Sequence, residues 1–335
     1  MDFKRKSLVC VLALILNTNL VLAEDRKLLA ASSKELVFMN IDGTNHEVIV
    51  QNDMYNIRSI AYHETRKYIY FTEYQSGNIT RFHFPSDDYI MKVIVQQNSG
   101  HVVSGITVDY INDYLYWTNS NDSSDGKILR SNLDGSDITL ILDFTSYGSL
   151  GVLEVDLING WIYFINALNG SIYRCMVDGS DLQLYFSSWW IYDIAIDNQD
   201  QRIYFSTSHS VGSTTHDGSD LRTIPIEYRF WSGHNRIELS GDDIFYSDNY
   251  LMYRATKTIL KQFGGDCEKY TAIKNEEKDQ RTISLTWQIV RSTSDEYLDD
   301  KWYRIFSANG DQMPSHPPGI MHCGTIYPIW LNGIY

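Results

Sequence analysis

Three acidic sequences could bind a cation or form turns, and the choice between these roles bears on what kind of protein this is. Asp-Gly-Ser-Asp occurs at Asp134-Gly135, Asp178-Gly179 and Asp217-Gly218. Clustered carboxylates suit Ca²⁺, but the acid spacing of an EF-hand is absent. Asp-Gly between short apolar runs is also a strong hairpin signal, because Asp bonds its own backbone and Gly adopts a positive φ. We therefore predict structural turns and no metal site.

Each acidic turn belongs to a longer unit that recurs along the chain. Aromatic segments such as "DYLYWTNS" recur 41 to 47 residues apart, centred on Tyr70, Tyr116, Tyr163, Tyr204 and Phe245. Seven residues before three of these centres, an Asp ends an apolar run, at Asp109, Asp156 and Asp197. Four strands, here called A to D in chain order, in a unit of this length are typical of a propeller blade. We expect the three Asp side chains to be repeated structural hydrogen-bond acceptors.

The N-terminus is typical of a secretory signal. Residues 1–23 have a basic start, an apolar middle and a small residue at the exit, Ala23, which predicts cleavage after Ala23. Removing them takes away one acid and three bases, so the net charge changes from −14 to −16. Such a charge argues against nucleic acid as a partner. No later apolar run is long enough to span a bilayer, so we expect no direct membrane insertion of this chain.

The strings "YLYWTN" and "SNLDGS" resemble the low-density lipoprotein receptor class B repeat, also called the YWTD repeat. The resemblance covers Lys27 to Phe263 and implies an all-β, six-bladed β-propeller over residues 24–265. Five units follow Asn56, and "KLLAASSKELVFMNIDGTNHEVIV" supplies three strands of a sixth blade. Its missing inner strand is expected from beyond Phe263, with segments starting at Tyr270 and Thr282 as candidates.

Residues 266–335 lack the repeat. The strings "WYRIF", "CGT" and "PIWLNG" resemble the eight-cysteine module of uromodulin, although two of that module's cysteines have no counterpart here. We predict a partial, irregular, cysteine-poor module. Cys267 and Cys323 are the candidates for one disulfide within it. Cys175 lies on an expected blade strand and is predicted to be a buried thiol.

One face of the expected propeller, here called the top face, carries the loops that connect strand D to strand A and strand B to strand C. Aromatic side chains concentrate in the D–A loops and are candidate ligand-binding residues, with packing between blades as the alternative role. They are Tyr147, Trp190, Tyr192, Tyr228, Phe230 and Trp231. Three glycosylation sequons, at Asn78, Asn121 and Asn169, fall in B–C loops of blades one to three. We expect a partner to dock on the remaining arc, blades four to six, which holds Trp190, Phe230 and Trp231.

These features favour a non-catalytic extracellular protein that binds a protein ligand on its top face and needs no cofactor. The resemblance implies similarity to the ectodomains of receptors related to the low-density lipoprotein receptor. A secreted matrix component is the alternative, and a membrane receptor ectodomain is expected if the chain continues further. A calcium-dependent propeller hydrolase is the catalytic alternative. No G-x-S-x-G or H-E-x-x-H motif supports catalysis, and the histidines are scattered singly.

Overall fold

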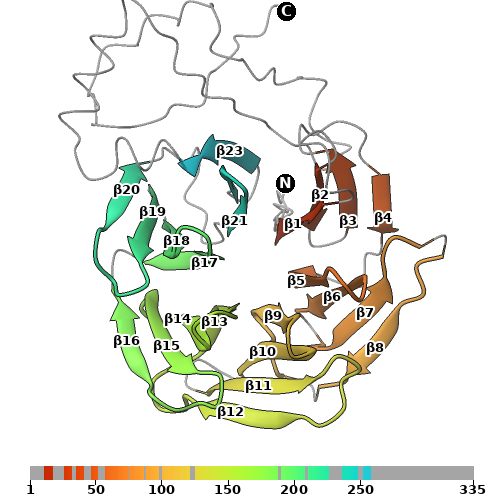
Figure 1. Ribbon diagram of the computed structural model, residues 1–335. Helices are drawn as coiled ribbons and strands as arrows, with labels where there is room; N and C mark the ends of the chain where they lie inside the picture. Colours follow the sequence, from red (N-terminus) through yellow and green to blue (C-terminus); the bar gives the residue numbers. More distant parts are fainter. Residues whose placement is uncertain are drawn as a thin grey trace, which may run out of the picture.

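The fold is a ring of β-sheets, seen along its axis in Figure 1. A computed structural model describes residues 11–17, 26–31, 35–40, 47–51, 57–74, 76–86, 88–97, 100–120, 125–187, 190–207, 210–225, 236–247 and 252–257. These residues form six antiparallel sheets and contain almost no helix. The prediction of an all-β, six-bladed propeller is confirmed. No helix among the described residues has the length and apolar character needed to cross a bilayer.

The first three sheets are the N-terminal blade, blade one and blade two, each with strands A to D from the inside outwards. The N-terminal blade contains β1 (Val11–Asn17), β2 (Arg26–Ala31), β3 (Glu35–Asn40) and β4 (Glu47–Gln51). Blade one contains β5 (Ile57–His63), β6 (Tyr68–Glu73), β7 (Ile79–His83) and β8 (Lys92–Val95). Blade two contains β9 (Ile106–Asp109), β10 (Tyr114–Ser120), β11 (Gly126–Asn132) and β12 (Thr139–Asp143).

Blades three to five complete the ring. Blade three contains β13 (Leu150–Asp156), β14 (Trp161–Asn166), β15 (Ser171–Met176) and β16 (Gln183–Phe186). Blade four contains β17 (Ile191–Asp197), β18 (Arg202–Thr207), β19 (Ser210–Thr215) and β20 (Arg222–Pro225). Blade five contains β21 (Arg236–Ser240), β22 (Asp243–Ser247) and β23 (Met252–Thr256), and its expected strand D lies outside the described residues.

The inner strand of the N-terminal blade differs from the one expected from the sequence. β1 pairs antiparallel with β2 and contacts β5 and β21, the inner strands of the two neighbouring blades. It lies within residues 1–23, the expected signal, so a chain cleaved after Ala23 would lack it. An apolar segment suits this position because a propeller's inner strand is packed on both sides. The two segments proposed for this position, starting at Tyr270 and Thr282, lie outside the described residues.

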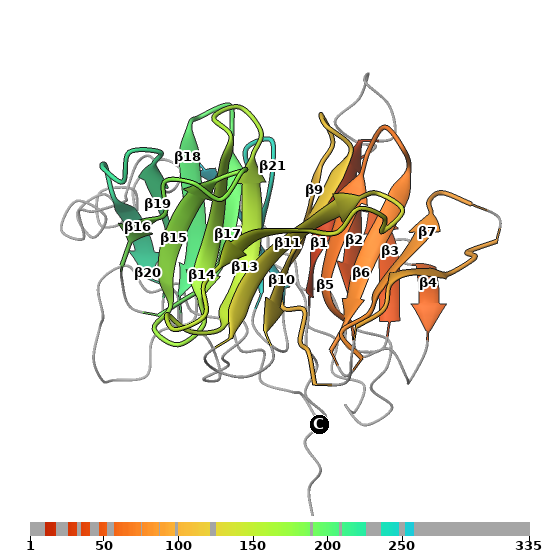
Figure 2. The ribbon, with the colours of Figure 1, turned by 90° about the horizontal axis from the view of Figure 1, so that it is seen from below.

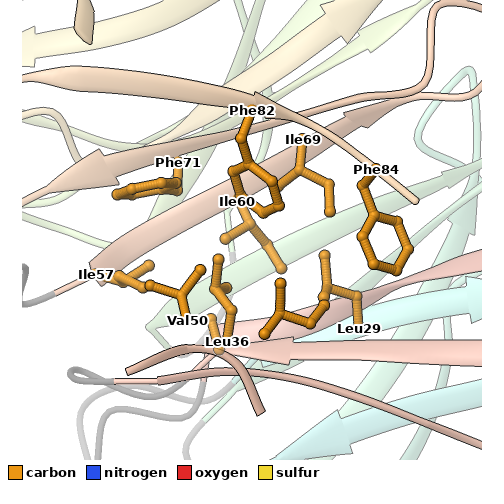
Figure 3. Packing of buried hydrophobic residues seen from close by; sticks show 11 residues of the cluster. Leu29, Leu36, Val50, Ile57, Ile60, Ile69, Phe71, Phe82 and Phe84 are labelled. Atoms are coloured by element: carbon orange, nitrogen blue, oxygen red, sulfur yellow. The ribbon is translucent and has the colours of Figure 1, made fainter. Parts of the chain in front are cut away.

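Apolar side chains fill the space between neighbouring blades, and this inter-blade layer is the core. Figure 3 shows the cluster between the N-terminal blade and blade one, where Leu29 and Leu36 meet Ile60, Phe71 and Phe82. Equivalent clusters join blade one to two, two to three, and three to four. The aromatic residues that centre the repeat are all fully buried, and they are Tyr70, Tyr116, Tyr163, Tyr204 and Phe245. The aromatic periodicity in the sequence therefore reports core positions.

A stacked arginine recurs on strand C. The guanidinium carbon of Arg81 lies 4.5 Å from the Tyr68 ring centroid in blade one, and the equivalent distance from Arg130 to Tyr114 in blade two is 4.3 Å. In blade three, Arg174 stacks on Trp161 at 4.3 Å and donates to the carbonyl of His216 in blade four, at 2.9 Å. Arg81 likewise donates to the carbonyl of Leu133 in blade two. All three arginines cover an aromatic side chain, and Arg81 and Arg174 also bridge to the next blade.

The Asp at the end of strand A shapes the turn that connects strand A to strand B. This turn lies on the bottom face, opposite the top face. Asp109 Oδ1 accepts hydrogen bonds from the amides of Ile111 and Asn112, at 3.0 and 2.9 Å. Asp156 and Asp197 accept the equivalent amide bonds in blades three and four. Two of these acids also contact a side chain of the following blade: Asp156 Oδ2 lies 3.1 Å from His216 Nδ1, and Asp197 pairs with the buried Lys257. The repeated Asp residues thus act as turn formers and blade connectors.

The Asp-Gly-Ser-Asp sequences form hairpin turns whose first carboxylate is used internally. Asp178 Oδ1 accepts from the amide of Ser180 at 3.0 Å and from its hydroxyl at 2.6 Å. The turns that begin at Asp134 and Asp217 repeat both bonds. Each turn leads into the outer strand of its blade, which is β12, β16 or β20. Figure 2 shows the ring from the side, with strands running between two loop-bearing faces. The turns lie at one end of these outer strands.

The glycine of the turn is required by the neighbouring blade as well as by its own conformation. Gly179 has a φ of +88°, and a Cβ built on it would overlap the carbonyl oxygen of Ile141, on strand D of blade two. Gly135 meets Ile94 of blade one in the same way. Gly218 has a φ of +82°, but the nearest atom to its Cβ, Tyr185 O, would be 3.6 Å away.

We predict that Gly179→Ala destabilises the propeller more than Gly218→Ala. Both alanines must adopt a left-handed backbone, which costs about 1–2 kcal/mol. Only Gly179→Ala also forces the blade-two carbonyl away, adding about 1–3 kcal/mol of overpacking. Urea denaturation of the two variants measures the difference in the free energy of unfolding. Equal destabilisation would show that the close approach between blades is not tight.

Candidate docking surface

Loops from three chain segments are bonded together on the top face over blade three. The side-chain amide of Asn166 donates to the carbonyl of Tyr147 at 2.9 Å, which ties strand B to the preceding D–A loop. The amide of Ile191 donates to the carbonyl of Gly170 at 3.0 Å, which ties the B–C loop to the following D–A loop. This part of the top face is therefore pre-organised.

Three apolar side chains stand exposed on these bonded loops. Tyr147 is 61% exposed, Leu168 is 50% exposed and Trp190 is 48% exposed. Leu168 lies directly over Gly148, where an added Cβ would be 2.7 Å from Leu168 Cδ1. We call Tyr147, Leu168 and Trp190 the blade-three patch. Large rigid apolar side chains gathered on a pre-organised surface are characteristic of protein interaction sites.

The backbone of Trp190 has an unusual conformation. Its φ is +37°, in the left-handed region that a bulky residue adopts at a cost of about 1–2 kcal/mol. The bond from Ile191 to Gly170 follows directly and holds the segment against the B–C loop. Strained residues held by their surroundings concentrate at functional sites. The conformation thus marks Trp190 as the residue of the patch whose placement is most constrained.

The structure brings together only part of the predicted ligand-binding set. Tyr147 and Trp190 are exposed in the patch, whereas Tyr192 is half-buried at a β-bulge of β17, where burial raises the pKa of its hydroxyl. The predicted residues Tyr228, Phe230 and Trp231 lie outside the described residues. Leu168 was missed by the sequence analysis, because nothing in a B–C loop sequence indicates which D–A loops flank it.

Two sequons are visible, and one of them lies beside the patch. Asn169 is exposed and directly precedes Gly170, which contacts Trp190. The sequence analysis placed Trp190 on an arc free of sequons, and the structure instead puts it next to one. Asn78 is half-buried in blade one, where its Oδ1 accepts from the amide of Gln97 at 3.3 Å. Asn121 lies outside the described residues.

The cysteines expected to form a disulfide, Cys267 and Cys323, also lie outside the described residues. Cys175 is fully buried, and burial raises the pKa of its thiol to about 12.

The second feature is a cluster of charged side chains on the inner strands, which the sequence analysis did not find. The hydroxyl of Thr107 on β9 donates to Glu154 on β13 at 3.0 Å. The amide of Ile237 on β21 donates to Asp193 on β17 at 3.0 Å. Each bond joins the inner strands of two neighbouring blades, so these side chains line the centre of the ring. The only available sequence signal was an acid inside three of the inner strands, β13, β17 and β21.

Two arginines complete this central cluster. The guanidinium of Arg236 donates to the carbonyl of Arg58 at 3.2 Å, linking blade five to blade one past the N-terminal blade. Arg236 Nη1 lies 3.8 Å from Asp193 Oδ1. Burial, and then repulsion from Arg236, lowers the pKa of Arg58 to about 10. The centre of the ring therefore holds both signs of charge in a poorly solvated environment.

Burial raises the pKa of every acid in the central cluster. Glu154 reaches about 8, because burial and repulsion from Asp193 outweigh the hydrogen bond from Thr107. Asp193 reaches about 6, since burial exceeds the opposing effects of Arg236 and two backbone amides. The pKa of Glu238 is raised well above its ordinary value by burial and then by Glu154. Within the described part of the chain, no three His, Cys, Asp or Glu side chains are arranged to hold a metal ion.

The fold is shared with solved structures of low sequence identity. The chain superposes on a structure of a nidogen/laminin complex with a TM-score of 0.61 and 15% identity, covering 72% of this chain and 92% of that one. A Bacteroides thetaiotaomicron protein of unknown function gives a TM-score of 0.55 at 13% identity, covering 74% and 69%. An auxiliary nutrient binding protein from the same bacterium gives 0.55 at 12%, covering 72% and 67%. These likenesses establish the propeller fold.

Sequence comparison gives a more limited match. No family model matches the chain. Protein cueball from Drosophila sechellia and from Drosophila simulans are each 36% identical to it over 97 residues, which is 28% of this chain. The match spans 15% of the length of these relatives.

We predict that Glu154→Gln stabilises the protein at pH 8 more than at pH 5. The folded-state pKa of Glu154 lies above its unfolded value, so the folded state binds the proton more tightly. The stability linked to this proton is present in full at acid pH, and it is lost as pH rises from about 4.5 to about 8. Glutamine avoids this loss and should gain about 1–2 kcal/mol at pH 8.

Thermal unfolding at the two pH values measures this effect, and Glu64→Gln, at an exposed turn position, is the control. An equal gain for Glu154→Gln at pH 5 and pH 8 would contradict a raised pKa.

Proposed function

We propose that this chain is a non-catalytic extracellular propeller that docks a protein partner on its top face. The observation that carries the proposal is the blade-three patch, in which Tyr147, Leu168 and Trp190 are about half exposed or more on mutually bonded loops. Aromatic side chains offer a large contact area at a small cost in conformational entropy. A patch fixed before binding loses little further freedom when a partner arrives.

The comparisons favour protein binding over other roles. The nidogen structure with the same fold was solved with laminin, a protein ligand. The leader-like N-terminus and the sequons agree with an extracellular setting. Within that setting, the chain acts either as a secreted matrix component or as the ectodomain of a receptor.

The absence of catalysis is part of this proposal. A calcium-dependent hydrolase would use acids at the ring centre, and Glu154, Asp193 and Glu238 do lie there. Glu154 and Asp193 are instead used in contacts between inner strands, with the Thr107 hydroxyl, the Ile237 amide and Arg236. We therefore expect that added Ca²⁺ leaves the melting temperature unchanged and that aryl esters are not hydrolysed. A calcium-dependent rise in melting temperature together with ester turnover would overturn the non-catalytic assignment.

Replacement of Trp190 and of Trp231, which is expected on the same face, should weaken partner binding. The test uses full-length protein freed of N-glycans with peptide-N-glycosidase, and a panel of purified extracellular proteins that includes laminin. Trp190→Ala combined with Trp231→Ala should lower the affinity for a bound partner about tenfold or more, since buried aromatic anchors dominate such interfaces. Surface plasmon resonance measures the dissociation constants.

The matched control is Leu184→Ala, which removes an exposed apolar side chain from the outer strand β16, away from the top-face loops. It should leave the affinity unchanged. Normal partner binding by a correctly folded tryptophan double variant would refute docking on this face.

A further inference from the structure

The sequon Asn169-Gly170-Ser171 lies in the middle of the blade-three patch. Leu168 directly precedes it, and an added Cβ on Gly170 would lie 2.6 Å from the Cα of Trp190. Trp190 is therefore in contact with the residue that follows the acceptor asparagine. Exposed apolar side chains therefore flank Asn169 on two sides. Leu168 precedes it in the chain, and Trp190 lies on the neighbouring D–A loop.

Asn169 has the geometry of an accessible acceptor. It is exposed, and its Oδ1 accepts the amide of Ser171 at 2.9 Å, which orients the side chain. Among the described residues, its Nδ2 donates no hydrogen bond. Asn78 differs, because it is half-buried and is followed by the buried residues Ile79 and Thr80.

We propose that an N-linked glycan on Asn169 covers the blade-three patch, with its first sugars packed on Trp190 and Leu168. In the modification, Asn169 Nδ2 forms a bond to C1 of the first N-acetylglucosamine and loses one proton. The bond from that C1 to the pyrophosphate of a lipid-linked oligosaccharide donor breaks, and the lipid pyrophosphate leaves. The sugar rings present apolar C–H faces that pack against aromatic and aliphatic side chains.

This inference rests on the extracellular setting of the proposed function, because the donor is available only in the secretory pathway. It also adds a regulatory feature to the docking surface. A partner reaches Trp190 in molecules that are unmodified at Asn169 and is excluded from it in molecules that carry the glycan. Occupancy of one sequon thereby selects which surface the propeller presents.

The test is made without a partner, on the full chain secreted with its own leader from cultured insect or human cells. Site-resolved mass spectrometry measures occupancy at the sequons, and hydroxyl-radical footprinting measures the solvent access of Trp190 and Leu168. We expect Asn169 to be occupied. Loss of its glycan in Asn169→Gln, or in Ser171→Ala, which keeps the asparagine, should raise the modification of Trp190 about twofold, because a sugar covers one of the two ring faces.

Asn78→Gln is the control, and it should leave the footprint of Trp190 unchanged. Glycan at Asn78 but none at Asn169, or an occupied Asn169 with unprotected Trp190, overturns this inference and leaves the proposed function standing. A secreted chain without glycan at any sequon also overturns the inference alone. A chain that is retained in the cytosol without glycans overturns both the inference and the extracellular setting.

Discussion

The close approach of each blade to the next is the constraint on which this structure depends. Gly105 shows it at the inner strands, where an added Cβ would lie 2.7 Å from the Cα of Val152 in blade three. The hydroxyl of Thr118 in blade two donates to the carbonyl of Gly151 in blade three, at 2.9 Å. A single sheet of four strands cannot bury its apolar faces alone, so its stability comes from both neighbours. The ring must therefore close for any one blade to be stable.

This close approach also makes the loops of the top face precise. The B–C loop of blade three is bonded to the D–A loops on both sides, so Tyr147 and Trp190 are fixed relative to each other although 43 residues separate them. A surface fixed in this way can serve a protein partner or the sugar of a nearby glycan. The two occupants compete for the same surface, because the glycan acceptor Asn169 lies next to the patch. Which of them covers Trp190 therefore depends on where the acceptor lies and not on which residues form the patch.

The centre of the ring is held differently from the space between blades. Apolar layers join neighbouring blades, whereas Glu154, Asp193 and Arg236 join inner strands through hydrogen bonds and opposite charges. Burial disfavours the charged form of each acid, so the centre is most stable where these acids bind protons. The contact between Arg236 and Arg58 spans the position of the N-terminal blade and links the last described blade to blade one.

The sequence by itself determined the class of fold. The spacing of Tyr70 to Phe245 and the Asp-Gly turns report positions within a blade, and these repeat because every blade buries the same strand in the same way. It did not determine which residues from different blades meet. Leu168 joins Tyr147 and Trp190, and Gly179 meets Ile141, only through the rotation of one blade against the next. The strand that fills the inner position of the N-terminal blade was also decided by tertiary packing, since any apolar segment with free backbone groups could satisfy that edge.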